Sequence, residues 1–236
     1  MVKKPQQVCI VIPAYNEATT IADVVKNAIR IFKNSPYDTK IVVVDDGSKD
    51  DTATIAEKSG AIVIKHILNS GAGAATATGL SYAEQTSFNI AATMDADGQH
   101  APEDVLRGIE VIIKQGDDLL IGSRLIDARG MSKTKILVNK GLSIITYLLF
   151  GINTTDSQSG LRIFSRKALR ELRWKTNGYE FCSEMLWRAK QLQLVIGEYP
   201  IQAIYTDYSK AKGQNNWNAI NIVKSLLKRR LAELLG

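Results

Sequence analysis

The sequence predicts an α/β protein with one open, mostly parallel sheet flanked by helices. Short apolar runs, as expected for strands buried on both faces, recur along the first half of the chain. Stretches with apolar residues at helical spacing separate them. Each apolar run ends in a polar or glycine-rich turn. Strands and helices that alternate in this way favour a parallel sheet.

The expected elements follow one another in a regular order. Strands are predicted at 8–13, 41–44, 61–65, 90–94 and 119–122. Helices are predicted at 21–32, 52–58, 72–84 and 102–114. Ligands bind beyond the carboxyl ends of the strands in such sheets, so the turns that follow these strands should share one rim.

The second half of the chain is less regular. An apolar segment at 136–152 precedes a polar stretch at 156–162, and a helix is expected over 181–193. A strand pair over 195–205 is interrupted at Pro200. A polar loop at 206–216 then leads to a terminal helix with apolar residues near one side and basic residues elsewhere. We expect one domain over 1–216 and a basic amphipathic helix over 217–236.

Composition narrows the function classes. The 236 residues are 45% hydrophobic and carry a net charge of +6, which indicates a globular protein with an anionic partner. Nucleic acid is not the expected partner, since no basic patch interleaved with aromatic residues occurs. Cys9 and Cys182 form no disulfide framework or metal pair, which fits a reducing cytoplasm. No apolar run reaches the ~18–20 residues of a membrane span, so any membrane association should be peripheral.

Asp95 and Asp97 are the most informative pair of residues. They follow the apolar run 90–94, and residues two apart on a strand point to the same side. Two convergent carboxylates repel unless a cation lies between them. Oxygen ligands suit Mg²⁺ or Mn²⁺, which typically bind a substrate diphosphate as well. A solvated Asp-Gly turn is the alternative interpretation of this motif taken alone.

Two further turns carry polar or small residues. Asp45 or Asp46 can accept a hydrogen bond from a base or a ribose, while Asp50 or Asp51 caps the following helix. The turn at 69–73 lacks the third glycine and the downstream acidic residue of a dinucleotide fingerprint, which disfavours an oxidoreductase. Its small residues instead allow close approach of a ligand.

Together these motifs predict a nucleotide-sugar site and resemble a known family. The segments Ile12-Pro-Ala-Tyr-Asn-Glu17, Val44-Asp-Asp-Gly-Ser48, 94–104 and Gly122-Ser-Arg124 resemble those of inverting family 2 glycosyltransferases of GT-A fold. With Asp156-Ser-Gln-Ser-Gly-Leu-Arg162, the chain resembles the dolichyl- or polyprenyl-phosphate mannosyl- or glucosyltransferase branch. It departs from that pattern at Ala72, where a lysine is common, and at Leu161, where phenylalanine is usual.

The resemblance implies a set of site residues. The donor would contact Pro13, Tyr15, Glu17, Asp45, Asp46, Gly71 and Asp95. A Mg²⁺ or Mn²⁺ ion would be held by Asp95, Asp97 and Gln99. The acceptor phosphate would meet Arg124, Arg162, Ser209 and Lys210. The catalytic residues would be Asp97, Arg124 and Asp156.

We therefore expect inverting transfer of a hexose from a nucleoside diphosphate sugar, of the GDP-mannose or UDP-glucose type, to a polyprenyl or dolichyl phosphate. A phosphate monoester is already ionised at neutral pH, with a second pKa of about 6, so it needs no obligate general base. Positioning and neutralisation of the leaving group then carry the rate. Further cations available for the acceptor are Lys133, Lys135 and Lys140.

The acceptor implies a membrane surface as a partner, at the cytoplasmic face. The segment 136–152 or the terminal helix could dock on an anionic membrane, or either could pack on the domain. A second interpretation keeps the donor but places a saccharide or protein hydroxyl as acceptor, which requires a base such as Asp156 or Glu184. A third is a catalytically silent nucleotide-binding partner of a membrane protein.

Overall fold

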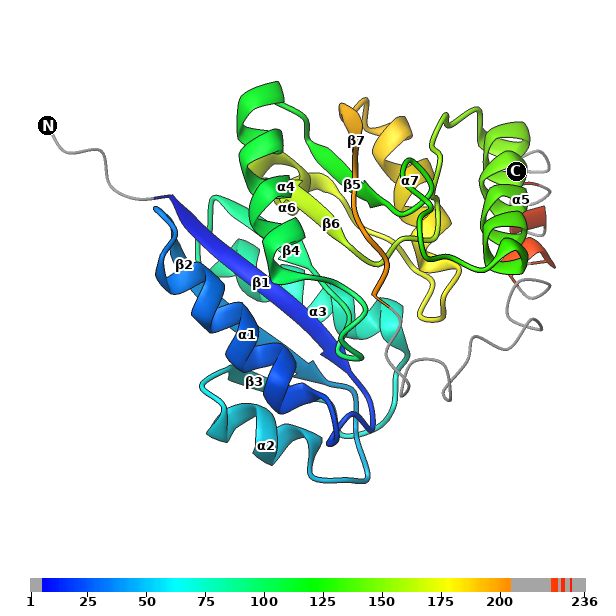
Figure 1. Cartoon of the computed structure of the whole chain (residues 1–236). Helices are drawn as coiled ribbons and strands as arrows, with labels where there is room; N and C mark the ends of the chain where they lie inside the picture. The colour runs from blue at the N-terminus through cyan, green and yellow to red at the C-terminus, as the bar shows by residue number, and fades with distance from the viewer. Residues whose placement is uncertain (1–5, 205–221, 225, 228–229, 231–236) are drawn as a thin grey trace, which may run out of the picture.

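A computed structural model describes residues 6–204, 222–224, 226–227 and 230. Within these residues a seven-stranded sheet has the strand order β3-β2-β1-β4-β6-β5-β7 (Figure 1). The strands are β1 (Gln7–Ala14), β2 (Asp38–Asp45), β3 (Ile62–Lys65), β4 (Ile90–Thr93), β5 (Leu119–Ser123), β6 (Arg162–Ser165) and β7 (Ile196–Pro200). The helices are α1 (Ile21–Lys33), α2 (Thr52–Lys58), α3 (Ala72–Gln85), α4 (Pro102–Gln115), α5 (Lys133–Phe150), α6 (Arg166–Glu171) and α7 (Phe181–Gln191).

The predicted fold class is confirmed, with one strand that the sequence did not indicate. The strands β3, β2, β1 and β4 pair in parallel, as do β5 and β7. The unexpected strand β6 lies antiparallel between β4 and β5. It is short and begins at Arg162 inside a polar stretch, so its apolar pattern is weak. The strand pair expected over 195–205 is wrong in part, because β7 ends at Pro200 and 201–204 form no strand.

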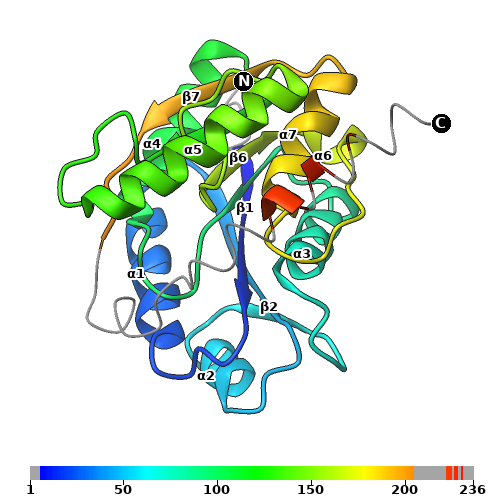
Figure 2. The same cartoon turned by 90° about the vertical axis from the view of Figure 1, so that its right-hand side faces the viewer.

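Two apolar layers hold helices on both faces of the sheet. In β1, Ile10 and Ile12 pack with α1 and α4, whereas Cys9 and Val11 pack on the layer that contains α3 and α7. This division follows from the alternation of side chains along a strand. Figure 2 shows α1 and α4 on one side of the sheet and α3, α6 and α7 on the other.

The helix α5 covers the apolar segment expected at 136–152 and presents two different sides. Leu142 and Phe150 are buried in the layer with α7. Leu137, Ile144 and Leu148, on the other side, are 73%, 58% and 73% exposed. The helix therefore packs on the domain and also carries an exposed apolar side.

The expected terminal helix lies mostly outside the described residues. Its described part is helical, and Ile222 and Leu226 are buried in the same layer as α7. These two residues therefore pack on the domain. Within the described ranges, no helix has the length and apolar content to cross a membrane.

Candidate active site

The polar turns that follow the strands meet at one rim of the sheet, as predicted. β1, β2, β4 and β5 point their carboxyl ends to this rim because they run in the same direction. The antiparallel β6 has its amino end there instead, and so adds the loop at 153–161. This loop faces the parallel-strand turns because of a strand that the sequence pattern did not reveal.

The side chain of Asp46 connects the turn between β2 and α2 to the loop before α3. Its Oδ1 accepts a hydrogen bond from the backbone N–H of Ser70 at 2.9 Å and lies 2.7 Å from His66 Nδ1. Its Oδ2 accepts from the N–H of Gly71 at 2.7 Å. The other ring nitrogen of His66 lies 2.9 Å from Thr78 Oγ1. Both oxygens of Asp46 are thus bound within the chain, which favours a structural role for this residue over the expected donor contact.

Asp45 differs from its neighbour. It is only 5% exposed, and its Oδ1 has no hydrogen-bond partner among the described residues. A buried acceptor without a partner is costly in an empty site. Asp45 is therefore the acidic residue of this turn that suits a ligand N–H or O–H group.

The turn after β1 is bound to the turn after β2. The backbone N–H of Asn16, which has a φ of 54°, donates to Ser48 Oγ at 2.9 Å. The N–H of Glu17 donates to Thr52 Oγ1 at 2.8 Å. These bonds hold the expected donor contacts Tyr15 and Glu17, which follow half-buried Pro13, beside the β2 turn. The N-cap residue of α2 is Asp51, but the side chain that accepts from the first helical N–H, that of Thr52, is Asp50, at 3.1 Å.

The small residues at the start of α3 make room for the chain itself. The N–H of Gly73 donates to Asn177 O at 2.7 Å. A Cβ on Gly71 would collide with the same carbonyl, and Gly71 has a φ of 99°. The loop between α6 and α7 therefore lies on the side of Gly71 where a side chain would be, and the expected contact of Gly71 with the donor stays a prediction.

Asp95, Asp97 and Gln99 lie together after β4. The backbone N–H of Asp95 donates to His100 Nδ1 at 3.1 Å, and the same nitrogen lies 3.6 Å from Asp95 Oδ2. Asp97 accepts from the N–H of Gln99 at 3.0 Å and from Gln99 Nε2 at 2.5 Å. His100, which the sequence analysis missed, therefore orients Asp95. The amide of Gln99 donates to Asp97 and so orients its carboxylate. This geometry does not support the expected role of Gln99 as a metal ligand.

The charges of this cluster suit a divalent cation. Burial raises the pKa of Asp97, and the nearby charge of Asp95 raises it further. No cluster of three or more His, Cys, Asp or Glu side chains able to hold a metal occurs in the described part of the chain. Two carboxylates with space for phosphate oxygens and water match the way proteins bind Mg²⁺ and Mn²⁺.

Gly160 brings the loop at 153–161 against this cluster. A Cβ there would collide with the Asp95 carboxylate. Thr93 Oγ1 of β4 donates to Gly160 O of this loop at 2.7 Å, and Ser159 Oγ of the loop donates to Gly122 O of β5 at 2.5 Å. The loop is thereby fixed to β4 and β5.

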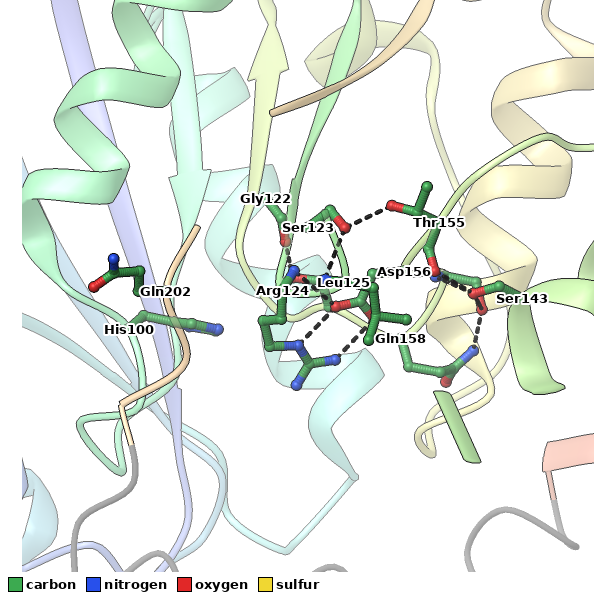
Figure 3. Close-up of polar contacts among 12 residues, drawn as sticks. His100, Gly122, Ser123, Arg124, Leu125, Ser143, Thr155, Asp156, Gln158 and Gln202 are labelled. Atoms are coloured by element: carbon green, nitrogen blue, oxygen red, sulfur yellow. Dashed lines mark hydrogen bonds and ion pairs between the residues drawn. The ribbon is translucent and has the colours of Figure 1, made fainter. Parts of the chain in front are cut away.

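Arg124 and Asp156 form a closed ion pair (Figure 3). Arg124 Nε donates to Asp156 Oδ2 at 2.7 Å, and Nη2 donates to Oδ1 at 2.9 Å. Asp156 is fully buried, whereas Arg124 is half-buried. Asp156 therefore positions Arg124 with both of its carboxylate oxygens, and this arrangement does not favour the catalytic role expected for it.

Glu198 of β7, also missed, holds the loop that carries Asp156. It accepts from Thr154 Oγ1 at 2.5 Å, from the N–H of Thr155 at 2.9 Å and from the N–H of Asp156 at 3.4 Å. A carboxylate opposite successive backbone N–H groups fixes a loop strongly. Glu198 thus determines where the Arg124–Asp156 pair lies.

Arg162 and Glu184 turn out to be buried structural residues. Arg162 is 1% exposed, and its guanidinium donates to Ser157 O, Ser159 O and Cys182 O. This geometry favours a structural role for Arg162 over the expected contact with the acceptor phosphate. Glu184 is 1% exposed and accepts from the backbone N–H groups of Lys175 and Thr176. Neither candidate base, Asp156 or Glu184, is presented to an acceptor hydroxyl.

Lys135 lies in the first turn of α5, near both halves of the site. Burial lowers its pKa, the charge of Arg124 lowers it further, and the charge of Asp97 opposes this shift. The charge of Lys135 thus interacts with one residue of the aspartate cluster and with Arg124. Ser209 and Lys210 fall outside the described residues.

Comparisons with known proteins show the family of the chain and its fold. The family described as Glycosyl transferase family 2 matches residues 9–173. A UDP-N-acetylglucosamine–dolichyl-phosphate N-acetylglucosaminyltransferase of Methanococcus voltae is 42% identical, over 96% of this chain and 97% of that protein. A polyprenol monophosphomannose synthase of Mycolicibacterium smegmatis is 28% identical, over 96% of this chain and 87% of that protein.

A solved structure shows the same fold. Glucosyl-3-phosphoglycerate synthase from Mycobacterium tuberculosis, in complex with Mn²⁺, UDP and glucosyl-3-phosphoglycerate, aligns with a TM-score of 0.73 at 22% identity. The alignment covers 95% of this chain and 80% of that one.

Proposed function

The chain belongs to glycosyl transferase family 2, and we propose that it transfers N-acetylglucosamine from a UDP donor to a dolichyl or related polyprenyl phosphate. The observation that carries this proposal is the 42% identity to an enzyme of that name over nearly the full length of both chains. The N-acetylated sugar replaces the hexose that the sequence motifs suggested.

The donor base would be read by Asp45. Its unpartnered Oδ1 can accept the ring N–H of uracil, and Tyr15 borders the same turn with 36% of its surface exposed. Asp46 and His66 hold this turn in place without contacting the ligand. The donor site therefore depends on one carboxylate for contact and on its neighbour for position.

The diphosphate would lie against Asp95 and Asp97. A divalent ion bound by these carboxylates would offset the negative charge that develops on the departing nucleoside diphosphate. The chain's own part is to hold the two carboxylates: His100 fixes Asp95, Gln99 fixes Asp97, and Gly160 leaves space beside Asp95. This preorganisation lowers the cost of bringing two like charges together.

The acceptor phosphate would be bound by Arg124 and Lys135. The carboxylate of Asp156 holds the Arg124 guanidinium by two bonds, so its orientation is set before substrate arrives. Both cations lie near the aspartate cluster, which would place the phosphate close to the donor sugar. Since neither Asp156 nor Glu184 is available as a base, an acceptor already ionised fits better than a hydroxyl. Ser209 and Lys210 are kept as proposed contacts from the neighbouring segment.

The exposed side of α5 would face the membrane that carries the acceptor. Leu137, Ile144 and Leu148 follow one another at helical spacing, and Lys133 and Lys140 are exposed on the same helix. An apolar stripe flanked by lysines suits the surface of an anionic bilayer. Because α5 begins at Lys133 beside the site, such docking would bring the lipid phosphate to Lys135. The segment 217–236 is a second proposed contact.

The proposal is tested by transfer into a lipid product. The protein is incubated with Mg²⁺, dolichyl phosphate and radiolabelled UDP-N-acetylglucosamine, UDP-glucose or GDP-mannose, and label extracted into organic solvent is counted. We expect label from UDP-N-acetylglucosamine to exceed the others. Label chiefly from GDP-mannose or UDP-glucose would restore the hexose donor, and binding without transfer from any donor would indicate a catalytically silent partner.

A further inference from the structure

Gln158 belongs to the loop at 153–161, which hydrogen bonds hold firmly in place. Its loop is bound from three elements: Glu198 of β7 takes the N–H groups of Thr155 and Asp156, and buried Arg162 of β6 donates to Ser157 O and Ser159 O. From α5, Ser143 Oγ accepts from the N–H of Ser157 at 3.0 Å. A side chain that projects from this loop is therefore presented in a fixed position.

The amide group of Gln158 is oriented by two serines. Its Nε2 donates to Ser183 Oγ at 2.8 Å and to Ser157 Oγ at 3.1 Å. Figure 3 shows this nitrogen turned toward Ser143 and its neighbours, with the amide oxygen turned away from them. Within the described ranges no residue donates a hydrogen bond to that oxygen, and the side chain is half-buried. The structure thus holds a fixed, accessible acceptor whose partner is not part of the chain described.

This acceptor lies close to the proposed position of the transferred sugar. Gly160, which contacts the Asp95 carboxylate, is only two residues further along, which corresponds to at most about 7 Å between the two Cα atoms. Arg124 is tied to Asp156, two residues before Gln158. Gln158 therefore belongs to a loop that meets the aspartate cluster through Gly160 and Arg124 through Asp156.

We propose that Gln158 Oε1 accepts a hydrogen bond from the sugar of the nucleotide donor, either from a ring hydroxyl or from the acetamido N–H. The inference rests on the proposed function, since it assumes a nucleotide sugar at the aspartate cluster. It assigns Gln158 to the sugar and not to the nucleotide, which gives it a specific test.

The test is the ratio of two dissociation constants, for UDP-N-acetylglucosamine and for UDP, measured by calorimetry with Mg²⁺. Gln158→Met keeps the length of the side chain but removes the acceptor. We expect it to weaken binding of the nucleotide sugar about 3- to 10-fold, the range of one neutral hydrogen bond, and to leave UDP within about twofold. An equal loss for both ligands, or no loss for either, would overturn the inference.

Three other variants separate sugar recognition from a purely structural role. Ser183→Ala removes the bond to the amide but leaves the oxygen, so the ratio should change less than in Gln158→Met. Equal changes would show that only the Gln158–Ser183 bond matters. Gln158→Glu retains an acceptor oxygen to which the serine hydroxyls can donate, so it should keep the wild-type ratio even if both affinities fall. Gln115→Met, at an exposed position at the end of α4, is the matched control.

Failure of the proposed function has a different outcome. Wild-type protein that binds GDP and GDP-mannose, but neither uridine ligand, would contradict the proposed donor. The same ratio, measured with the guanosine pair, then decides the role of Gln158. Wild-type protein that binds none of the four would overturn both proposals.

Discussion

Two pairs of aspartates end the strands that flank β1, and the structure uses them differently. Asp45 and Asp46 follow one another at the end of β2, and Asp95 and Asp97 lie two residues apart after β4. Both carboxylate oxygens of Asp46 are bound by Ser70, Gly71 and His66, whereas Asp45 keeps a buried oxygen without a partner among the described residues. In the other pair, the charge of Asp95 raises the pKa of Asp97.

The difference follows from the partners that each carboxylate meets. At the end of β2, Asp46 is bound by the loop before α3, whereas Asp45 keeps an oxygen without a partner among the described residues. Asp95 and Asp97 lie beyond the end of β4, in the turn that follows it, and their charges interact, which favours a cation. In the first pair, therefore, Asp46 holds a loop in position and Asp45 is proposed to contact the ligand. In the second pair, both residues are proposed to hold the same cation. The following predictions, from the largest effect to the smallest, test this comparison.

Asp97→Asn should give the largest effect on activity. It keeps the shape and one oxygen that can accept from the backbone N–H of Gln99, but removes one of two charges proposed to hold the cation, so transfer should fall by about 1,000-fold or more. The assay is the extraction of labelled lipid. Asp23→Asn, at an exposed position in the first turn of α1, is the control and should retain activity. Activity of Asp97→Asn within tenfold of wild type would show that the pair has no shared role.

Asp45→Asn should weaken nucleotide binding with little effect on stability. A hydrogen bond to a charged acceptor contributes about 1.5–3 kcal/mol, so the dissociation constant of UDP should rise about 10- to 100-fold. Binding is measured by calorimetry, and the unfolding temperature is measured in parallel. Unchanged affinity for UDP would remove Asp45 from the donor site.

Asp46→Ala should act in the opposite way, on the fold. It leaves the N–H groups of Ser70 and Gly71 and the ring of His66 without their acceptor. We expect a loss of about 2–4 kcal/mol in the free energy of unfolding, measured with urea. A loss below about 0.5 kcal/mol, with strongly weakened binding of UDP, would reverse the roles assigned to the two neighbours.

The smallest effect should be a gain in stability in Asp97→Asn without divalent ions. The folded state raises the pKa of Asp97 above its unfolded value, so ionisation weakens the fold at pH above the raised pKa. The variant should therefore unfold about 2 °C higher than wild type near pH 7. This difference should shrink as the pH falls through the raised pKa and disappear below the unfolded pKa of about 4, where Asp97 is protonated in both states. A difference that is independent of pH would contradict this cause.

The parallel half of the fold could be predicted because each strand there is a continuous apolar run with a helix after it. β6 could not, since four residues beginning with Arg162 carry little apolar signal and their pairing with β4 and β5 is long-range. Its antiparallel direction is what brings the loop with Asp156, Gln158 and Gly160 to the rim. The part of the site proposed for the acceptor thus depends on contacts between residues that lie far apart in sequence.

The residue types of the site could be predicted, but their individual roles could not. Sequence alone could not distinguish Asp45 from Asp46, because that choice is made by the N–H groups of Ser70 and Gly71. Arg162 was expected to meet a phosphate, since nothing in the sequence shows that three carbonyl groups surround it. His100 and Glu198 were missed because their partners are backbone N–H groups, which leave no pattern in the sequence.

The central claim is that Asp95 and Asp97 together hold a divalent ion against the diphosphate of the donor. The direct measurement is the affinity of UDP with and without Mn²⁺, by calorimetry, in wild type and in Asp97→Asn. We predict that Mn²⁺ strengthens UDP binding about tenfold or more in wild type and by less than about twofold in the variant. Equal strengthening in both proteins, or none in wild type, would contradict the account.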